Sequence, residues 1–448
     1  MTKNKILIFT TRHLCYNSGD FFAAQLANGF EENGIECEYC ELEFDELRFA
    51  GMNVAEVDAA VTRGERKTWT GARESSAALL TEKSQRKLEC YLGKSYLAVI
   101  DFNSRMPHMI LDDGSYYLDG LDAPFYDYIL DHPLYHHSTL SCQLKNFNVI
   151  LLDRNQCDCV REYYPWIENV IFQPLGGQQA ISPILPKDKK LEVLFTGTYR
   201  DPETVSEQMV KEKDETIRDC MLAMIEWLHK NPNGTVEQAL KVYLTGGCSN
   251  TNDHLCENSE GELMKLLNAC YPVEIYIRNL YRKNLIDAFA KEKVPLRIVG
   301  DWWEQYEHFQ DAVSITYQPA VSFARSFELI NQSAVLLDSS PFFQYGIHDR
   351  VTAAMANRTI ALTDENMYIH QLNHQESEHI RLTEKLVERD VGSFIPTYEV
   401  NLPEAAVERA AELLSNLAFR EELAEQAYDL YQREFTWKRV AKRLLDIF

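Results

Sequence analysis

The sequence predicts an α/β protein with two Rossmann-like domains that face a cleft and a helical insertion in the second domain. Three observations support this fold class. Short apolar runs alternate with stretches of helical periodicity in two separate parts of the chain, which is typical of parallel sheets covered by helices. A segment with two prolines and a charge run, residues 181–190, separates the two parts. The length of 448 residues exceeds what one core usually holds.

The first alternation begins with an apolar run over residues 5–10, followed by a polar loop that contains Asp20. Phe22, Leu26 and Phe30 then recur at four-residue spacing, which indicates a helix, and Gly34 offers its end. Further apolar runs predict five more strands in this half, at residues 35–41, 96–101, 126–130, 148–152 and 170–173.

The second alternation starts directly after the proline-rich segment. Its predicted strands cover residues 191–195, 296–299, 313–317, 334–337 and 359–362. A helical insertion at about 203–293 lies between the first two strands and is broken near 231–234 and again at 246–261. We therefore predict an N-terminal domain at 1–185 and a C-terminal domain at 186–434.

The last residues, 435–448, have a helical pattern of their own. Trp437, Val440, Leu444 and Ile447 repeat at three and four residues, so they form one apolar face. This face could pack on either domain, and packing back on the N-terminal domain is one expectation.

The bulk composition excludes several classes of protein. Hydrophobic residues make up 45% and charged residues 25%, as in ordinary soluble globular proteins, and the formal net charge is −23. This charge argues against a general nucleic-acid or anionic-membrane surface, because such partners require extended basic patches. Without an apolar run long enough to span a bilayer or a secretory leader pattern, we expect a cytoplasmic protein. The odd number of cysteines, eleven, favours reduced thiols.

Charged groups gather at one junction of the C-terminal half, in the stretch SSPFFQYGIHDRVTAAMANRTIALTD at residues 339–364. Gly346 ends a loop there, and His348, Asp349 and Arg350 fall in the first turn of a predicted helix. A helix N-terminus carries partial positive charge, so an imidazole and a guanidinium added to it favour phosphate binding. The alternative is a surface helix whose Asp349 merely complements the helix dipole.

Four phrases of the C-terminal half occur in an order that resembles the glycosyltransferases of GT-B fold, and most closely the group related to spore maturation protein CgeB. They are Leu194-Phe-Thr-Gly-Thr-Tyr199, Arg297-Ile-Val-Gly-Asp-Trp-Trp303, Phe327-Glu-Leu-Ile-Asn-Gln-Ser333, and Gly346-Ile-His-Asp-Arg-Val351 with Ala354-Met355-Ala356. The resemblance covers about residue 191 to the end. It implies hexosyltransferase-like transfer of a sugar from a nucleotide-diphosphate sugar, without a dedicated metal or other cofactor, and no strand-end D-x-D motif argues otherwise.

Two departures from the resembling sequences bear on mechanism. Related family 4 enzymes carry a pair of glutamates where this chain has Tyr345 and Ala353, so their retaining mechanism cannot be carried over. Asn357 stands where a glycine usually follows the helix, and asparagine tolerates the left-handed conformation that a helix end often needs.

The resemblance and the local pattern together give a set of donor-binding candidates. His348 and Arg350 are expected to bind the leaving diphosphate, supported by Gly197 and Thr198 after the first strand. Arg200 in the same loop is a further candidate, although a solvated loop arginine is the more ordinary interpretation. With the glutamate pair absent, the candidates for ribose binding are Asp349, Asp364 and the backbone. The full donor set is Gly197, Thr198, Arg200, Tyr345, Gly346, His348, Asp349, Arg350 and Asp364.

The general base is expected in the N-terminal domain. Asp131 and His132 follow an apolar run, and histidine suits proton transfer near neutral pH. The alternative is that His132 caps the turn before Pro133. His13 and Asp20 in the first loop are the rival location, where Asp20 is equally credible as a helix N-cap.

The sequence therefore favours a glycosyltransferase that acts on a protein, glycan or small-molecule acceptor. The first alternative is a GT-B-type nucleotide-sugar epimerase or hydrolase. The second is a catalytically silent ligand-binding or scaffold protein, which the missing glutamate pair makes more credible. We expect no nucleic-acid partner and no integral membrane segment. Trp302 and Trp303 could stack on a base or sugar, although tryptophans more often pack in cores.

Overall fold

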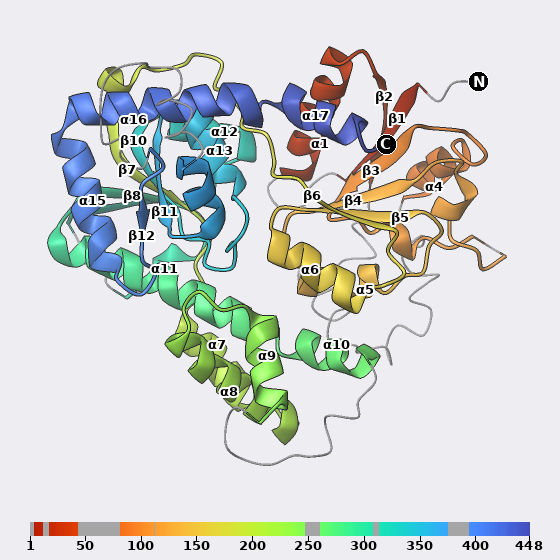
Figure 1. Cartoon of the computed structure of the whole chain (residues 1–448), viewed down its shortest axis with the longest axis horizontal. Coiled ribbons are helices and arrows are strands. Elements are labelled where there is room, and N and C mark those ends of the chain that lie inside the picture. Colours follow the sequence, from red (N-terminus) through yellow and green to blue (C-terminus); the bar gives the residue numbers. More distant parts are fainter. Residues whose placement is uncertain are drawn as a thin grey trace. The chain divides into compact units, whose positions relative to one another are not determined.

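The computed structural model describes residues 4–11, 18–43, 81–111, 113–246, 260–307, 313–374 and 394–448 (Figure 1). The chain folds into two compact units. Unit 1 holds residues 1–173, 258–271 and 437–448, and unit 2 holds 174–257 and 272–436. The division falls before the proline-rich segment that we used as the predicted boundary, and it assigns part of the predicted insertion to unit 1.

Unit 1 is built on a parallel sheet of six strands in the order β2-β1-β3-β4-β5-β6. The order reverses direction between β1 and β3, which makes this the switch point of the sheet. β3, β4 and β5 are fully buried, as expected for the middle of a sheet with covered faces. The strands are β1 Lys5–Thr11, β2 Glu36–Leu42, β3 Ala98–Phe102, β4 Phe125–Ile129, β5 Phe147–Leu151 and β6 Asn169–Phe172.

The helices of unit 1 come from three distant parts of the sequence. α1 buries the predicted face of Phe22, Leu26 and Phe30, and it starts two residues before Asp20, which therefore lies in its first turn. The α-helices are α1 Ser18–Glu32, α4 Glu82–Glu89, α5 His137–Leu140, α6 Arg154–Tyr163, α10 Glu260–Ala269 and α17 Trp437–Leu445. Short 3-10 turns are η2 Met106–His108, η3 Leu118–Gly120 and η4 Pro133–His136.

The C-terminal helix α17 packs on α1, near the start of the chain (Figure 1). Trp437, Val440 and Leu444 are buried, and the Trp437 ring lies 6.0 Å from the ring of Phe22. Ile447 was expected on the same face but is 48% exposed, because α17 ends at Leu445 and the chain then turns. Gly29 makes the close approach possible, because a β-carbon there would overlap the carbonyl oxygen of Trp437.

Unit 2 contains a second parallel sheet of six strands in the order β12-β11-β10-β7-β8-β9. Its direction reverses between β7 and β10, so the first strand of the unit again lies at the switch point. The short edge strand β12 had no counterpart in the sequence analysis. The strands are β7 Leu191–Thr196, β8 Leu296–Val299, β9 Ile315–Gln318, β10 Ser333–Leu337, β11 Ile360–Asp364 and β12 Thr397–Tyr398.

The helices of unit 2 form two groups. α12 and α13 pack on each other, and α16 contacts α13 and β11, whereas α11 and α15 pack together and α15 contacts β10 and β12. The predicted insertion is indeed helical between β7 and β8 and is broken at residues 231–235. The helices are α7 Pro202–Val210, α8 Glu215–Lys230, α9 Val236–Leu244, α11 Pro272–Glu292, α12 Phe323–Gln332, α13 Asp349–Ala356, α15 Pro403–Ser415 and α16 Leu417–Leu430. Three short turns complete the unit: η5 Pro186–Asp188, η6 Trp303–Gln305 and the π-turn η7 Tyr431–Phe435.

The segment that precedes β7 is fastened to unit 2 by side chains. Asn357 donates to the carbonyl of Gln178 and accepts from the amide of Ala180, both at 2.8 Å. The expectation that Asn357 itself adopts a left-handed conformation is wrong. Its φ is −106°, and the positive φ falls on the next residue, Arg358, at 51°. Asn357 is buried because its amide joins the end of α13 to the incoming chain.

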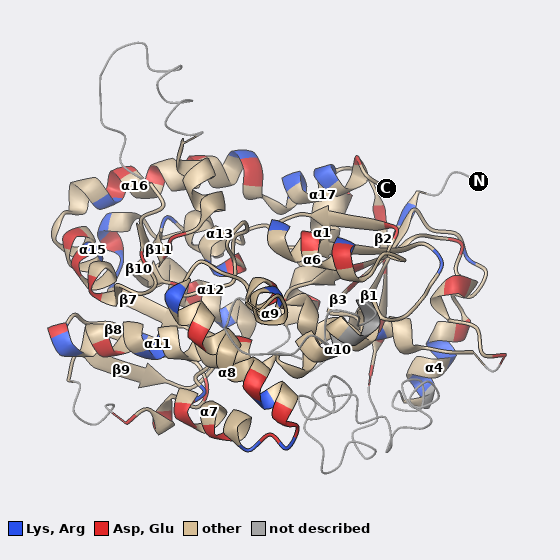
Figure 2. Ribbon diagram, turned by 60° about the horizontal axis from the view of Figure 1, so that its bottom comes forward, with Lys and Arg blue, Asp and Glu red and all other residues tan. Residues whose placement is uncertain are grey.

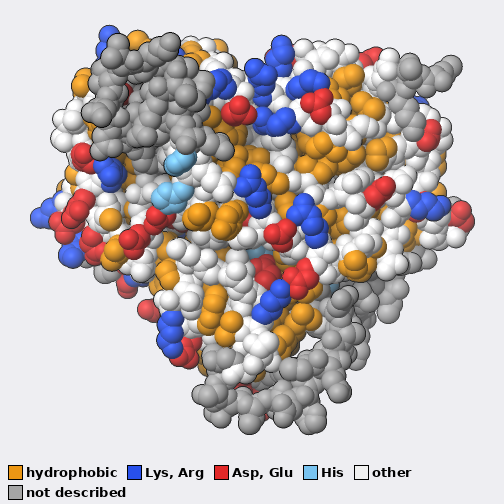
Figure 3. Space-filling model, viewed as in Figure 1, with side chains coloured by type: hydrophobic (Ala, Val, Ile, Leu, Met, Phe, Trp, Pro, Cys, Tyr) orange, Lys and Arg blue, Asp and Glu red, His pale blue; other side chains and the backbone are white. Residues whose placement is uncertain are grey.

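The predicted fold class is confirmed in its α/β composition, its two parallel sheets and its helical insertion. Charged residues lie mainly on the helices, as Figure 2 shows for α7, α8, α15 and α16. On the face drawn in Figure 3, basic and acidic residues are interspersed rather than gathered into one basic patch. Among the described residues, no helix has the length and apolar character needed to cross a membrane.

The close contact at Gly29 gives a test of the packing between α1 and α17. We expect Gly29→Ala to lower the free energy of unfolding by about 1 to 2 kcal/mol, because the new methyl group overlaps the Trp437 carbonyl and overpacking outweighs the gain in helix propensity. Urea denaturation monitored by circular dichroism measures the change. Gly19→Ala in the same helix is the control, since its β-carbon meets no described atom within 4 Å. Equal stability of the two variants would contradict the proposed packing constraint.

Candidate functional site

The candidate donor site lies at the switch point of the sheet in unit 2. Two loops leave the carboxyl ends of neighbouring strands there, residues 197–201 after β7 and residues 338–348 after β10. The N-terminus of α13 follows the second loop. In open α/β sheets this is the place where ligands bind, because two loops diverge from adjacent strands and leave a crevice.

Arg350 joins these elements through a buried ion pair. Its Nε lies 3.0 Å from Oδ1 of Asp338, the residue directly after β10. Its Nη1 donates to the carbonyl of Thr196 at the end of β7. Asp338 is fully buried and Arg350 nearly so. Burial alone would raise the pKa of Asp338, but the charges of Arg350 and His348 outweigh it and hold the pKa below its ordinary value.

His348 is the N-cap of α13 rather than a residue of its first turn. Its Nδ1 lies 2.6 Å from Oδ1 of Asp349 and 3.3 Å from the amide nitrogen of Arg350. Burial acts to raise the pKa of Asp349, but His348 and Arg350 lower it overall. The carboxylate of Asp349 thus stays charged beside the His348 ring and the Arg350 guanidinium, and the three candidates at positions 348–350 form one connected cluster.

Asp364 at the end of β11 holds the loop that follows Asp338. Both of its carboxylate oxygens lie 2.9 Å from the amide nitrogen of Ser340. Burial and the neighbouring Asp338 raise the pKa of Asp364 to about 7. Ser340 in turn donates to Asp338 at 2.9 Å. Asp364, a ribose candidate from the sequence, therefore lies inside the candidate site and orients its backbone.

Gly197 lies where two strand ends come very close. A β-carbon at Gly300, after β8, would overlap the carbonyl oxygen of Gly197, and the ring nitrogen of Trp303 donates to the same oxygen at 2.7 Å. Trp303 is fully buried and stacks on Tyr199, so its role is core packing. A β-carbon at Gly197 itself would lie 3.3 Å from Nη1 of Arg350, so the loop after β7 passes close to the guanidinium.

The remaining donor candidates lie around this centre. The Arg200 amide donates to Oδ1 of Asn279 on α11 at 3.0 Å, and its guanidinium lies 5.4 Å from the ring centre of the exposed Trp302. Gly346 is buried and Tyr345 half-buried in the loop before α13. Thr198 follows Gly197 and is half-buried.

In unit 1, Asp131 and His132 follow β4. His132 caps η4, because its Nδ1 accepts the amide hydrogen of Leu134 at 3.3 Å, as the alternative interpretation expected. Asp131 is exposed and accepts from the side-chain amide of Asn103 at 2.9 Å rather than from a backbone group. His13 lies outside the described residues.

Next to the switch point of the unit 1 sheet, the neighbouring strands β3 and β4 hold a pair of carboxylates that the sequence analysis did not single out. Asp101 on β3 and Asp127 on β4 are register partners and are both buried. Ser104 links them: its hydroxyl donates to Asp101 at 2.6 Å, and its amide donates to Asp127 at 2.9 Å. Burial raises the pKa of Asp101 to about 7, with Asp20 adding to the effect, and raises the pKa of Asp127 well above its ordinary value.

The residues that sequence reasoning missed share one signal. Asp101, Asp127 and Asp338 each lie in or directly after an apolar strand, where a charged residue is out of place unless it has a partner. Asp338 directly precedes the stretch of residues 339–364, and Asp127 lies four residues before Asp131. A search for carboxylates within or directly after the predicted strands would have found all three.

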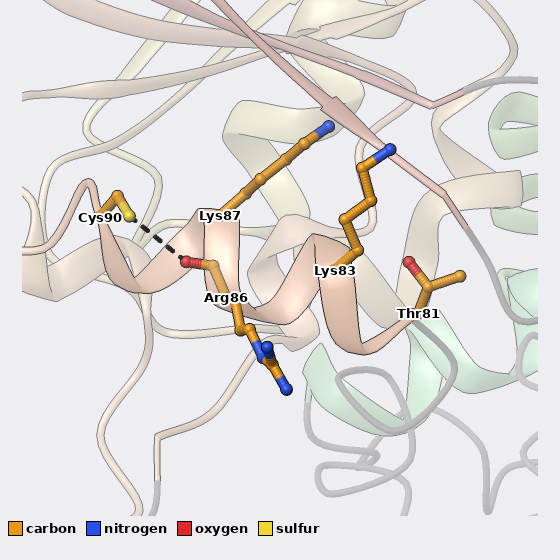
Figure 4. Close-up of a pocket in the computed structure, with 5 residues that line it drawn as sticks. All are labelled: Thr81, Lys83, Arg86, Lys87 and Cys90. Carbon is orange, nitrogen blue, oxygen red and sulfur yellow. Dashed lines mark hydrogen bonds between the residues drawn. The ribbon is translucent and has the colours of Figure 1, made fainter.

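Basic side chains also line an open depression beside α4 (Figure 4). Lys83 and Lys87 point the same way and Arg86 points away from them. Lys87 donates to the carbonyl of Glu41 at 2.7 Å, and Lys83 lies 3.8 Å from the carboxylate of Glu43. These contacts bind α4 to β2 and its end. Within the described ranges, no group of three or more His, Cys, Asp or Glu residues is placed to hold a metal ion.

The raised pKa of Asp101 predicts a pH-dependent stability. Between the ordinary carboxyl pKa and about 7, the folded state binds more protons than the unfolded chain, so stability falls as pH rises through this window and is level above it. We expect Asp101→Asn to reduce the loss of unfolding free energy between pH 5 and pH 8 by about 2 kcal/mol. Urea titrations at the two pH values measure this, with Asp113→Asn in an exposed turn as the control. Equal pH dependence in wild type and Asp101→Asn would contradict the proton uptake.

The family comparison matches the C-terminal part of unit 2 and the C-terminal helix α17, which belongs to unit 1. Residues 278–446 match the family model described as glycosyl transferase-like, and this range includes α13 and all strands after β7. No curated protein matches the sequence.

Solved structures that resemble this chain include three with low identity. T4 phage BGT in complex with UDP-glucose is 11% identical, with 99% of this chain and 98% of that chain covered and a TM-score of 0.47. An alpha-glucosyltransferase in complex with UDP is 12% identical, with 99% of each chain covered and a TM-score of 0.49. TarM is 9% identical, with 78% of this chain and 54% of that chain covered and a TM-score of 0.41.

Proposed function

We propose that the protein is a glycosyltransferase that transfers a sugar from a nucleotide-diphosphate sugar, with the donor bound at the switch point of unit 2. The observation that carries the proposal is the connected cluster of His348, Asp349 and Arg350 at the N-terminus of α13, fixed by Asp338 between two strand ends. The match of residues 278–446 to a glycosyl transferase-like family model supports it. Membership of the CgeB-like group and a cytoplasmic location are parts of the same proposal.

Donor binding requires groups that stabilise the departing diphosphate. The amides at the start of α13, the imidazole of His348 and the guanidinium of Arg350 supply hydrogen bonds and positive charge at one place. Gly197 and Thr198, directly after β7, allow the backbone to approach the donor closely, and Arg200 adds a positive charge in the same loop. Tyr345 and Gly346 shape the loop before α13. Asp349 and Asp364 are the proposed carboxylates for the ribose. Asp364 acts indirectly, because it orients the backbone of Ser340.

Transfer also requires a base if the configuration at the sugar inverts. We propose Asp131 with His132 for this role, with His13 or Asp20 as the rival groups. His132 accepts a backbone hydrogen bond at Nδ1, which places the ring proton on Nε2 in the neutral form. In this arrangement the carboxylate of Asp131 would take the proton of the acceptor, and the Nε2–H of His132 would position the acceptor. The reaction is proposed to need no metal ion, as the resemblance implies, and the acceptor is a protein, glycan or small molecule.

A donor panel tests the proposal. We expect one of the UDP-, GDP-, dTDP- or CMP-sugars to bind in calorimetric titration, and Arg350→Lys to weaken that binding about tenfold, because lysine keeps the ion pair with Asp338 but lacks the planar fork that binds phosphate. Alanine at position 350 would leave Asp338 buried without its partner, so it is a poorer test.

Arg358→Lys is the matched control, since Arg358 lies just beyond the other end of α13 and pairs with Glu425 at 2.7 Å. The proposal fails if no donor binds at millimolar concentration and none is hydrolysed. Products formed from donor alone, an epimer or a free sugar, would favour the epimerase or hydrolase alternative. Donor binding without any turnover would favour the silent protein.

The base is tested by its effect on turnover at saturating donor. We expect Asp131→Asn and His132→Gln each to lower the rate of donor consumption about 100-fold while donor affinity stays unchanged, since a base acts on the acceptor and not on the bound nucleotide. His137→Gln, in which the lost ring contacts the hydroxyl of Tyr164 at 2.9 Å, is the control. Wild-type rates in both variants would exclude Asp131 and His132 from the reaction.

A further inference from the structure

Three consecutive backbone carbonyls, at the end of β7 and in the loop that follows it, each accept a hydrogen bond from a side chain. The carbonyl of Thr196 accepts from Arg350, that of Gly197 from Trp303, and that of Thr198 from Nη1 of Arg282 at 3.2 Å. Arg282 lies on α11, in the part of the chain that the sequence predicts only as a helical insertion. Two guanidinium groups therefore hold the loop from opposite ends, with Gly197 between them.

The charge of Arg282 is buried and lacks a carboxylate partner in the described parts of the chain. The residue is 6% exposed, and no described Asp or Glu oxygen lies within ion-pair distance of it. Glu274, which could have paired with it, lies 3.1 Å from Arg278 one turn away. The Nε of Arg282 is buried with no hydrogen-bond partner among the described residues. Arg350, by contrast, has Asp338.

The environment of Arg282 opposes its positive charge. Burial lowers the pKa of Arg282 to about 9, and the charges of Arg278 and Arg350 act in the same direction, while Asp338 and Glu274 offset only part of this effect. A buried charge without a directly paired carboxylate is costly, whereas one hydrogen bond to a carbonyl contributes little stability and a neutral side chain could supply it. The fold alone gives no reason to keep an arginine here. A bound anion would supply one.

We propose that Arg282 and Arg350 together form a two-guanidinium seat for the diphosphate of the nucleotide donor, with Arg282 as a donor-binding residue. The inference rests on the proposed function and adds a residue from α11 to it. Arg350, Arg282 and Asp338 leave one net positive charge around Gly197, which attracts the negatively charged diphosphate. Each guanidinium presents a planar fork of N–H donors that matches phosphate oxygens.

The test compares wild type with Arg282→Met, which keeps the apolar stem and removes the charge, and with Lys283→Met as the matched control. Lys283 is the next residue of α11, and its ammonium pairs with Asp287 at 3.0 Å. Calorimetry measures binding of UDP, GDP and dTDP, of the three corresponding nucleosides, and of inorganic pyrophosphate. Thermal unfolding of the ligand-free proteins measures whether each variant is folded.

We expect Arg282→Met to bind the preferred nucleoside diphosphate and pyrophosphate at least about tenfold more weakly, with the affinity for the nucleoside unchanged. Lys283→Met should stay within about twofold of wild type. The ligand-free melting temperature of Arg282→Met should equal or exceed that of wild type, because an unpaired buried charge is removed. If the methionine variant does not fold, Arg282→Gln keeps a donor for the Thr198 carbonyl and serves in its place.

The outcomes separate this inference from the proposed function. Wild type that binds neither a nucleoside diphosphate nor pyrophosphate overturns both. Wild type that binds them while Arg282→Met and Arg282→Gln bind them equally well overturns only the role of Arg282. The role of Arg282 is also overturned if Arg282→Met melts at a lower temperature and binds the nucleoside and the nucleoside diphosphate equally more weakly. A purely structural arginine would give that result.

Discussion

The buried ion pair between Arg350 and Asp338 is the interaction on which the candidate site depends. It joins the end of β10 to the N-terminus of α13, and through the Thr196 carbonyl it reaches the end of β7. A buried carboxylate is costly unless it is paired, so Asp338 fixes where the guanidinium lies. The positive groups at the switch point are thus held in place before any ligand arrives, and preorganised positive charge is what a departing diphosphate requires.

In both sheets of the protein, buried carboxylates lie within or directly after the strands, but their partners differ. In unit 2 the aspartates meet arginine and backbone amides, and Asp338 keeps its charge. In unit 1 Asp101 and Asp127 meet Ser104 and the Phe102 amide rather than a cation that offsets their burial, so the pKa of both is raised. The two sheets therefore hold their buried carboxylates in chemically different surroundings: beside an arginine in unit 2, and without a cation that offsets their burial in unit 1.

The strands could be predicted almost completely from the sequence, because a buried strand in a parallel sheet is a short apolar run between turn residues. Among the strands that the structure describes, all but β12 fall on predicted runs, and β12 has only two residues. The site was predicted less completely. The group at positions 348–350 was recognisable because a loop glycine and a helix N-terminus are local features. Asp338 carried only the general signal of a carboxylate directly after a strand. Arg282 carried no signal, since the carbonyl that it contacts lies in an element distant in the sequence.

The sequence by itself determined the two alternations of strand and helix, the loop that ends at Gly346 and the gathering of charge at the start of α13. Local periodicity and helix-end chemistry carry this information. Only the tertiary structure decided that Asp338 pairs with Arg350, that Asn357 holds the incoming chain while Arg358 takes the left-handed turn, and that α11 brings Arg282 to the Thr198 carbonyl. The physical reason is that pairing energy depends on distance in space, and a single sequence contains no record of which distant groups the fold brings together.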